Sequence, residues 1–147
     1  MTATLVLSVP VAADAARTWA AAVDWDQQGQ WMLGTSVRAT AQGGQGVGGG
    51  IEAITGFGPF GVKDTMRITT WDPPRACDVA HTGRVVQGTG RFSVEPSGPG
   101  SSVFHWREDL ELPLGIVGRL GWVLVRPLFR LGVQVSLNRF ARWVEAG

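Results

Sequence analysis

The spacing of hydrophobic residues changes along the chain, and the first change marks a passage from strand to helix. Residues 4–9 alternate apolar and more polar side chains, the period of two that is typical of a half-buried strand. Residues 12–23 are rich in alanine and carry apolar residues at helical spacing. Residues 24–26 then offer an N-cap for a second short helix that carries Trp31 and Leu33. The first part of the chain therefore predicts one strand followed by two short helices.

Strand-like runs separated by glycine and proline occupy the middle of the chain. They predict six further strands, at residues 36–41, 49–55, 62–72, 75–82, 85–95 and 102–112. Because these runs follow one another directly, we expect them to pair as antiparallel hairpins.

The remaining C-terminal segment is helical in character. From residue 127 to residue 145 its apolar residues, Phe129 among them, form a broad stripe, and the small residues Gly132 and Ser136 leave room on the same side. Pro127 suits the first turn of a helix better than an interior, so we expect a break there. The whole chain, residues 1–147, is thus predicted to be a single α+β domain with helices on one face of a seven-stranded antiparallel sheet.

The amino-acid composition is rich in bulky apolar residues and includes a single cysteine. The chain is 44% hydrophobic and has seven tryptophans and six phenylalanines but no tyrosine, which suggests bulky apolar walls. Its one cysteine, Cys77, excludes an internal disulfide and a cysteine-based metal cluster. The N-terminus lacks the basic region of a signal peptide. We therefore expect a cytoplasmic protein without a metal or cofactor.

Charge is nearly balanced, at a formal +1. Twelve arginines and one lysine are interleaved with acidic residues, which argues against nucleic-acid binding. Residues 114–135 are apolar, but arginines and a proline interrupt them, so no membrane-spanning helix is expected. Arg119, Arg126 and Arg130 fall within one narrow helical arc. This arc is either a weak membrane-surface or partner-docking element or a solvated basic face over a helix packed on the core.

Two segments match the dinucleotide-binding pattern G-x-G-x-x-G, residues 44–49 and 56–61. Each runs into strand-like sequence and lacks the helix whose N-terminus would face a pyrophosphate. We interpret both as glycine-rich turns at the rim of the sheet.

Strand alternation places three ionisable residues on the apolar side of the predicted sheet. Asp64 shares a side with Met66, His81 shares one with Cys77, and Glu108 shares one with Trp106. Hairpin pairing places Asp64 diagonally beside His81. The sequence therefore predicts a row of Asp64, His81 and Glu108 on the concave face.

Two glycines lie on the same side, between His81 and Glu108. Gly88 and Gly90 lie four and two positions before Phe92 on the same strand, so all three point to the same side of the sheet. The hairpin register places His81 opposite residues 86–88 and Glu108 opposite residues 88–90. A strand free of side chains at these positions would let His81 and Glu108 approach each other. We expect valine at Gly88 or Gly90 to weaken ligand binding while stability holds or rises, unless one of them has a positive φ.

The row has two interpretations. It is either a satisfied buried network that stabilises the fold or a polar site that orients a ligand in an apolar pocket. In the second case the ligand-binding residues, with no metal among their partners, would be Trp25, Trp31, Asp64, Met66, His81, Gly88, Gly90, Phe92, Trp106, Glu108, Phe129, Gly132 and Ser136.

The order of elements resembles the START-like superfamily, in particular its actinobacterial polyketide cyclase/dehydrase-like branch. The resemblance spans the chain and includes DWDQQGQW (24–31), KDTMRITTWDPPRACDVAHTGRVVQGTGRFSVEP (63–96), FHWREDLELPLG (104–115) and SLNRFARWVE (136–145). It implies a helix-grip fold, in which a curved seven-stranded antiparallel sheet wraps a long C-terminal helix around a cavity for lipids, polyketides or similar ligands. Members that are enzymes share no catalytic triad, so no catalytic role transfers by motif.

Three functions follow as hypotheses. The first is binding of an apolar, ring-containing small molecule between the sheet and the last helix. The second is a cofactor-independent polyketide cyclase, aromatase or dehydratase in which His81 acts as general base or acid and Asp64 and Glu108 tune it. The third is docking to a membrane surface or a partner through the arginine-bearing helix.

Overall fold

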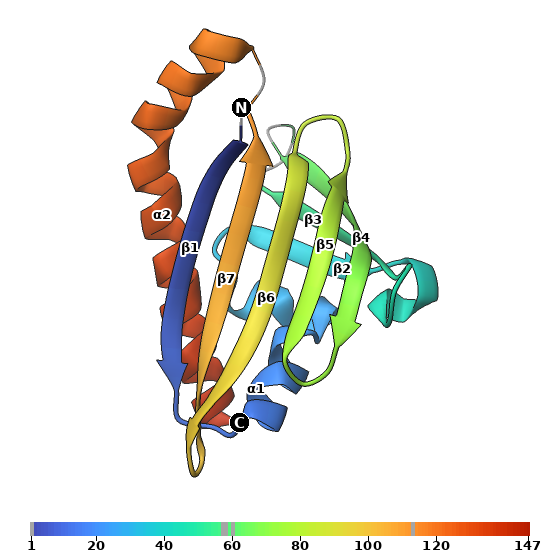
Figure 1. Cartoon of the computed structure of the whole chain (residues 1–147), viewed down its shortest axis with the longest axis vertical. Coiled ribbons are helices and arrows are strands. Elements are labelled where there is room, and N and C mark those ends of the chain that lie inside the picture. The colour runs from blue at the N-terminus through green and yellow to red at the C-terminus, as the bar shows by residue number, and fades with distance from the viewer. Residues whose placement is uncertain (1, 57–58, 60, 113) are drawn as a thin grey trace.

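The computed structural model describes residues 2–56, 59, 61–112 and 114–147, and they form a curved antiparallel sheet with the long C-terminal helix packed along it (Figure 1). The seven strands are β1 (Thr2–Val11), β2 (Thr35–Ala39), β3 (Gly50–Thr55), β4 (Val62–Asp72), β5 (Ala76–Thr82), β6 (Gln87–Gly98) and β7 (Ser101–Glu111). Their order across the sheet is β1-β7-β6-β5-β4-β3-β2. The predicted α+β helix-grip architecture is confirmed, with strand ends within two or three residues of the expected ones.

Strand β1 shows the expected alternation most clearly, because every second side chain along it is buried. It extends past Pro10, which was not expected from the sequence. The strand lies at the edge of the sheet and pairs only with β7 among the described strands. Proline is tolerated on an edge strand, since its missing N–H can face away from the ladder.

Two short helices follow β1 as predicted. Helix α1 (Ala15–Ala22) begins at the N-cap Asp14, whose carboxylate accepts a hydrogen bond from the Arg17 N–H at 2.8 Å. The second, η1 (Trp25–Gln30), is a 3-10 helix, and Trp31 and Leu33, which were expected on it, lie beyond its end. A further 3-10 turn, η2 (Ala41–Gly44), was not predicted.

The C-terminal helix α2 (Gly115–Ala146) is continuous, so the predicted break at Pro127 is wrong. Proline at this position cannot donate a hydrogen bond to the carbonyl of Val123. The Val123 side chain is 68% exposed and Pro127 is exposed as well. Water can therefore satisfy the freed carbonyl, and the helix passes through the proline. No helix in the described ranges is long and apolar enough to cross a membrane.

The core lies between the concave face of the sheet and the helices. Trp31, Phe104 and Phe140 are fully buried and pack ring against ring, with centroids 4.6–6.3 Å apart. The buried apolar side chains of α2 all lie in its second half and are Val133, Leu137, Phe140, Ala141 and Val144. The first half leaves the space above the aromatic cluster unfilled.

Candidate functional site

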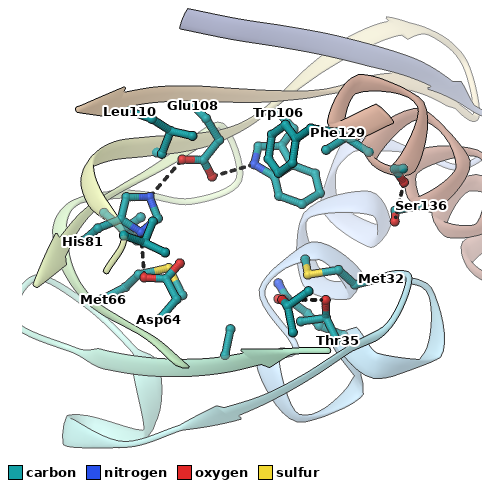
Figure 2. A pocket seen from close by; sticks show the side chains of 18 of the residues that line it. Met32, Thr35, Asp64, Met66, His81, Trp106, Glu108, Leu110, Phe129 and Ser136 are labelled. Carbon is teal, nitrogen blue, oxygen red and sulfur yellow. Dashed lines mark hydrogen bonds and ion pairs between the residues drawn. The ribbon is translucent and has the colours of Figure 1, made fainter. Parts of the chain in front are cut away.

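A cavity of about 580 Å³ occupies the space between the sheet and helix α2 (Figure 2). Its floor is formed by inward side chains of β3 to β7, its roof by α2, and one side by the segment that joins η1 to β2. The volume lies within the range of about 300–1,000 Å³ that is usual for small-molecule sites. The cavity is therefore large enough for a molecule with several rings.

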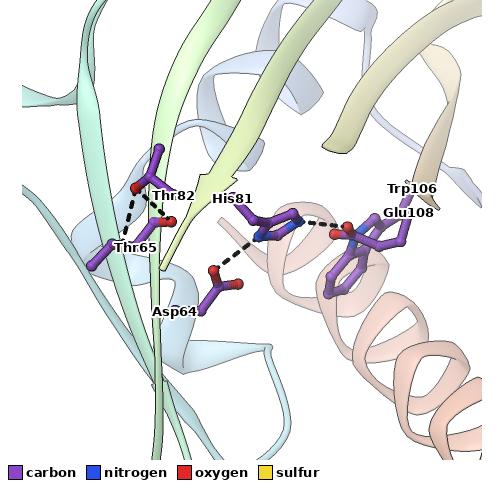
Figure 3. A network of polar contacts seen from close by, with 6 residues as sticks. All are labelled: Asp64, Thr65, His81, Thr82, Trp106 and Glu108. Carbon is purple, nitrogen blue, oxygen red and sulfur yellow. Dashed lines mark hydrogen bonds and ion pairs between the residues drawn. The ribbon is translucent and has the colours of Figure 1, made fainter. Parts of the chain in front are cut away.

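The ionisable row predicted from alternation is present at one end of the cavity (Figure 3). The His81 Nδ1 atom lies 2.9 Å from Asp64 Oδ1, and its Nε2 atom lies 2.8 Å from Glu108 Oε2. Trp106 Nε1 donates a further hydrogen bond of 2.8 Å to Glu108 Oε1. The row therefore continues into an aromatic side chain that also lines the cavity.

The register of the strands explains how this row forms. His81 on β5 lies opposite Gly88 on β6 and Met66 on β4, and Glu108 on β7 lies opposite Gly90 on β6. Thr65 and Thr82, the neighbours of Asp64 and His81 along their strands, hydrogen-bond each other on the other face of the sheet. Alternation thus divides the polar residues between the two faces as the sequence predicted.

Gly90 provides the clearance that brings Glu108 to His81. A Cβ atom at this position would lie 3.0 Å from both carboxylate oxygens of Glu108. That separation is tighter than a normal van der Waals contact, so any side chain would displace the carboxylate. Gly90 also lines the cavity, as expected. Because a side chain here would disturb the contact between Glu108 and His81, the earlier expectation that stability would hold or rise on substitution is replaced by an expected loss.

Gly88 does not have the predicted role. Its φ is +119°, and a Cβ atom there would overlap the backbone carbonyl oxygen of Asp109. It is absent from the cavity lining, so the expectation that valine at Gly88 would enter the ligand space is wrong. The glycine is required by close approach of two backbones and not by the cavity.

The environment of His81 keeps the imidazole protonated near neutral pH. Burial alone lowers the pKa of His81, but the hydrogen bonds and charges of Asp64 and Glu108 outweigh it and raise the pKa from 6.5 to about 10. Both ring nitrogens then donate to carboxylates. Two carboxylates around one imidazolium leave this end of the cavity with an excess of negative charge.

The row also leaves hydrogen-bond acceptors facing the cavity. The His81 side chain is only 3% exposed and both of its nitrogens are occupied, so it has no donor to offer. The Asp64 side chain is 19% exposed, and its Oδ2 atom has no hydrogen-bond partner among the described residues. The accessible polar atoms of the row are therefore carboxylate oxygens.

Eleven of the residues predicted for the site line the cavity. They are Trp25, Asp64, Met66, His81, Gly90, Phe92, Trp106, Glu108, Phe129, Gly132 and Ser136. Trp25 is held in place by a 2.7 Å hydrogen bond from its Nε1 atom to the Gly44 carbonyl. Ser136 is anchored by donating to the Gly132 carbonyl at 2.9 Å.

Trp31 is the second predicted residue that the structure places elsewhere. It is completely buried, and its ring packs on Phe92, Trp106 and Phe140 beneath the cavity. It follows η1 directly, where the chain passes from helix to strand, and its bulky indole fills the core at that junction. Trp31 therefore supports the lining aromatics without belonging to the wall.

Several lining residues were missed. The apolar ones from the sheet, such as Ile51, Val79 and Leu110, point to the same side of their strands as the residues that were predicted for the site. Strand alternation could therefore have identified them as well. Met32 comes from the connection after η1, where no periodicity signals an inward side chain, and Thr35 is the first residue of β2. Val125 and Leu128 belong to the part of α2 around the expected break.

Other chemistry at the cavity is limited. Burial raises the pKa of the Cys77 thiol to about 12, so this lining residue remains protonated and is a poor nucleophile. In the described part of the chain, no group of three or more histidine, cysteine, aspartate or glutamate side chains is arranged to hold a metal ion. The glycine-rich segment 44–49 leads into β3, which confirms it as a turn, while residues 57, 58 and 60 of the second segment lie outside the described residues.

Comparison with known proteins gives a family match over nearly the whole chain. Residues 2–145 match the profile of the family described as polyketide cyclase / dehydrase and lipid transport. No curated protein matches the sequence.

Solved structures with the same fold have low sequence identity. A protein from Thermus thermophilus is 17% identical, with a TM-score of 0.82 over 98% of each chain. The Zhui aromatase/cyclase from a Streptomyces species is 14% identical, with a TM-score of 0.81 over 99% of this chain and 94% of that one. A START superfamily protein from Mycobacterium smegmatis is 16% identical, with a TM-score of 0.67 over 97% and 94% of the two chains.

Proposed function

Because the chain belongs to the polyketide cyclase / dehydrase and lipid transport family, we propose that it binds a small hydrophobic molecule in the cavity between the sheet and helix α2. The observation that carries the proposal is the 580 Å³ cavity with an ionisable row at one end. Aromatic side chains, among them Trp25, Phe92, Trp106 and Phe129, supply flat walls for a ring-containing ligand.

The row defines which end groups the ligand can carry. Oxygens of Asp64 and Glu108 accept hydrogen bonds, and the row has a net negative charge when His81 is protonated. A hydroxyl or amino group on a ring therefore satisfies the row. A ligand carboxylate at the same place would be repelled by the negative charge of the row. Its oxygens would also face the carboxylate oxygens of the row with no donor between them.

A pair of fluorescent probes of the same size tests this proposal. We expect 2-aminoanthracene to bind in the cavity and anthracene-2-carboxylate to bind at least about 10-fold more weakly, because two like charges a few ångströms apart repel strongly in a partly buried site. Fluorescence titration of each probe at neutral pH measures both affinities.

Two matched variants locate the effect. Asp64→Asn is expected to reduce the preference for the amine, because it removes one charge from the row. Asp72→Asn serves as the control, since Asp72 lies on the same sheet but pairs with Arg75, and neither residue lines the cavity. Failure of both probes to bind the wild-type protein contradicts the binding function, and equal affinities contradict the role of the row.

Catalysis is the second candidate, and the charged row in an apolar cavity is the observation that favours it. Protonated His81 is unsuited to act as a base near neutral pH, so the carboxylates of Asp64 and Glu108 are the better proton acceptors. In a cyclisation one carboxylate would take a proton from a carbon between two carbonyl groups, and the enolate carbon would add to a second carbonyl of the same molecule. The protonated carboxyl would return the proton to the new alkoxide, and loss of the resulting hydroxyl together with a proton from the neighbouring carbon would release water.

Turnover distinguishes the two candidates. A poly-β-keto thioester incubated with the protein would give a cyclised, dehydrated product by mass spectrometry if the row is catalytic. Conversion should then disappear in Glu108→Gln while the variant stays folded and still binds 2-aminoanthracene, with only the reduced preference for the amine that loss of one charge from the row predicts. Variants that alter affinity without any conversion by the wild-type protein leave binding as the function.

A further inference from the structure

The first half of helix α2 exposes a continuous row of large apolar side chains. This apolar strip consists of Ile116, Leu120, Val123, Leu124 and Leu131, which lie on the side of the helix turned away from the cavity and are 61–78% exposed. None of the described residues from 115 to 131 is buried. Figure 1 shows this part of the helix beside β1 at the margin of the fold.

The second half of the same helix has an ordinary surface. Its outward positions are occupied by Gln134, Asn138 and Arg142, while its inward side chains join the core. The change from apolar to polar therefore occurs along a single helix face. Exposed apolar surface of this extent in a small domain marks a place where another molecule binds.

Positive charge borders the apolar strip. Arg119, Arg126 and Arg130 fall in one arc along its edge, and residues 112–144 contain no aspartate or glutamate. None of the three arginines forms an ion pair with another residue in the described ranges. The segment thus combines apolar side chains with cations whose charge is not neutralised by the helix itself.

We propose that the apolar strip docks on an anionic phospholipid surface. Leucine, isoleucine and valine side chains would enter the boundary between headgroups and acyl chains, and the three arginines would pair with headgroup phosphates. A second copy of the chain fits the strip less well, because two facing strips would bring six arginines together and no carboxylate from either helix. Anionic lipids complement both the apolar and the cationic part.

Docking at this place would bring the membrane next to the cavity. Val125, Leu128 and Phe129, on the inner side of the same helical segment, line the cavity roof. A hydrophobic ligand could then pass between bilayer and cavity along α2. This consequence rests on the proposed ligand binding, whereas docking itself does not.

Vesicle flotation of the full chain tests the docking. We expect binding to vesicles of phosphatidylcholine mixed with phosphatidylglycerol, weaker binding at high salt, and little binding to phosphatidylcholine alone. Arg119→Gln/Arg126→Gln/Arg130→Gln is expected to bind about 100-fold more weakly, at roughly a five-fold loss for each arginine. Leu120→Ser/Leu124→Ser is expected to bind roughly 10-fold more weakly or worse.

A charge-matched control separates local docking from general attraction. Arg67→Gln/Arg75→Gln/Arg84→Gln removes the same number of exposed charges from the sheet and its turns and should bind like the wild type. Equal losses in both triple variants, or no binding to anionic vesicles, overturn the proposal. So does a dimer in analytical ultracentrifugation that Leu120→Ser/Leu124→Ser dissociates, since the strip would then be an interface between two copies. Binding of 2-aminoanthracene without vesicles reports on the cavity separately, so either proposal can fail alone.

Discussion

Replacing Gly88 with valine is expected to destabilise the protein by more than about 3 kcal/mol and to prevent folding of much of it. The φ of +119° at this residue is one that side chains rarely adopt, and a Cβ atom would overlap the Asp109 carbonyl oxygen on the neighbouring strand. That oxygen belongs to a backbone paired on both sides, in β7, and cannot move away. Urea unfolding followed by tryptophan fluorescence measures the loss.

Gly90→Ala is the control for this prediction. A Cβ atom at Gly90 meets only the end of the Glu108 side chain, which can rotate away. The variant is therefore expected to fold with a modest loss of stability and with a weakened contact between Glu108 and His81. If Gly88→Val were as stable as the wild type, the backbone conformation assigned to β6 at this point would be wrong.

Replacing His81 with leucine is expected to lower the free energy of unfolding by about 3–5 kcal/mol, because it leaves two carboxylates facing each other without a cation. Asp64→Asn/His81→Leu/Glu108→Gln removes the carboxylate charges together with the imidazole and should recover most of the loss. Chemical denaturation at neutral pH compares the two variants. A triple variant as unstable as His81→Leu would show that packing of the imidazole, and not charge, explains the effect.

The same ion pairs make stability depend on pH. The pKa of His81 is raised from 6.5 to about 10 in the folded protein, so its contribution is fully present below about pH 6.5 and is lost as the pH rises toward 10. The free energy of unfolding should fall through this window by up to about 1.4 kcal/mol per pH unit. His105, on the other face, is the control: the fall should persist in His105→Asn and disappear in His81→Gln.

Much of the site followed from local alternation. The side chains of successive strand residues point to opposite faces, so the parity of Asp64, His81 and Glu108 relative to their apolar neighbours fixed the face on which they lie. Short turns then fixed the register closely enough to predict that the three meet. These features depend only on neighbouring residues and on hairpin geometry.

Strand alternation did not predict features that depend on backbone conformation or on long-range packing. Gly88 and Gly90 have the same parity, yet one permits a close contact between strands and the other clears space for a carboxylate. The difference lies in φ, which alternation does not determine. Trp31 likewise has a large aromatic side chain that would suit the cavity wall. Its complete burial depends on how Phe92, Trp106 and Phe140 pack around it.

The sequence by itself determined the order of strands and helices, the face on which the Asp64–His81–Glu108 row lies, and the arginine arc of the last helix, because each follows from spacing along the chain. Only the tertiary structure decided that α2 continues through Pro127, that its first half lies over an open cavity of about 580 Å³, and that its apolar strip remains exposed. Apolar residues at helical spacing do not reveal which molecule covers them. That is set by how far the helix lies from the sheet, and this distance results from long-range packing of its second half against the core.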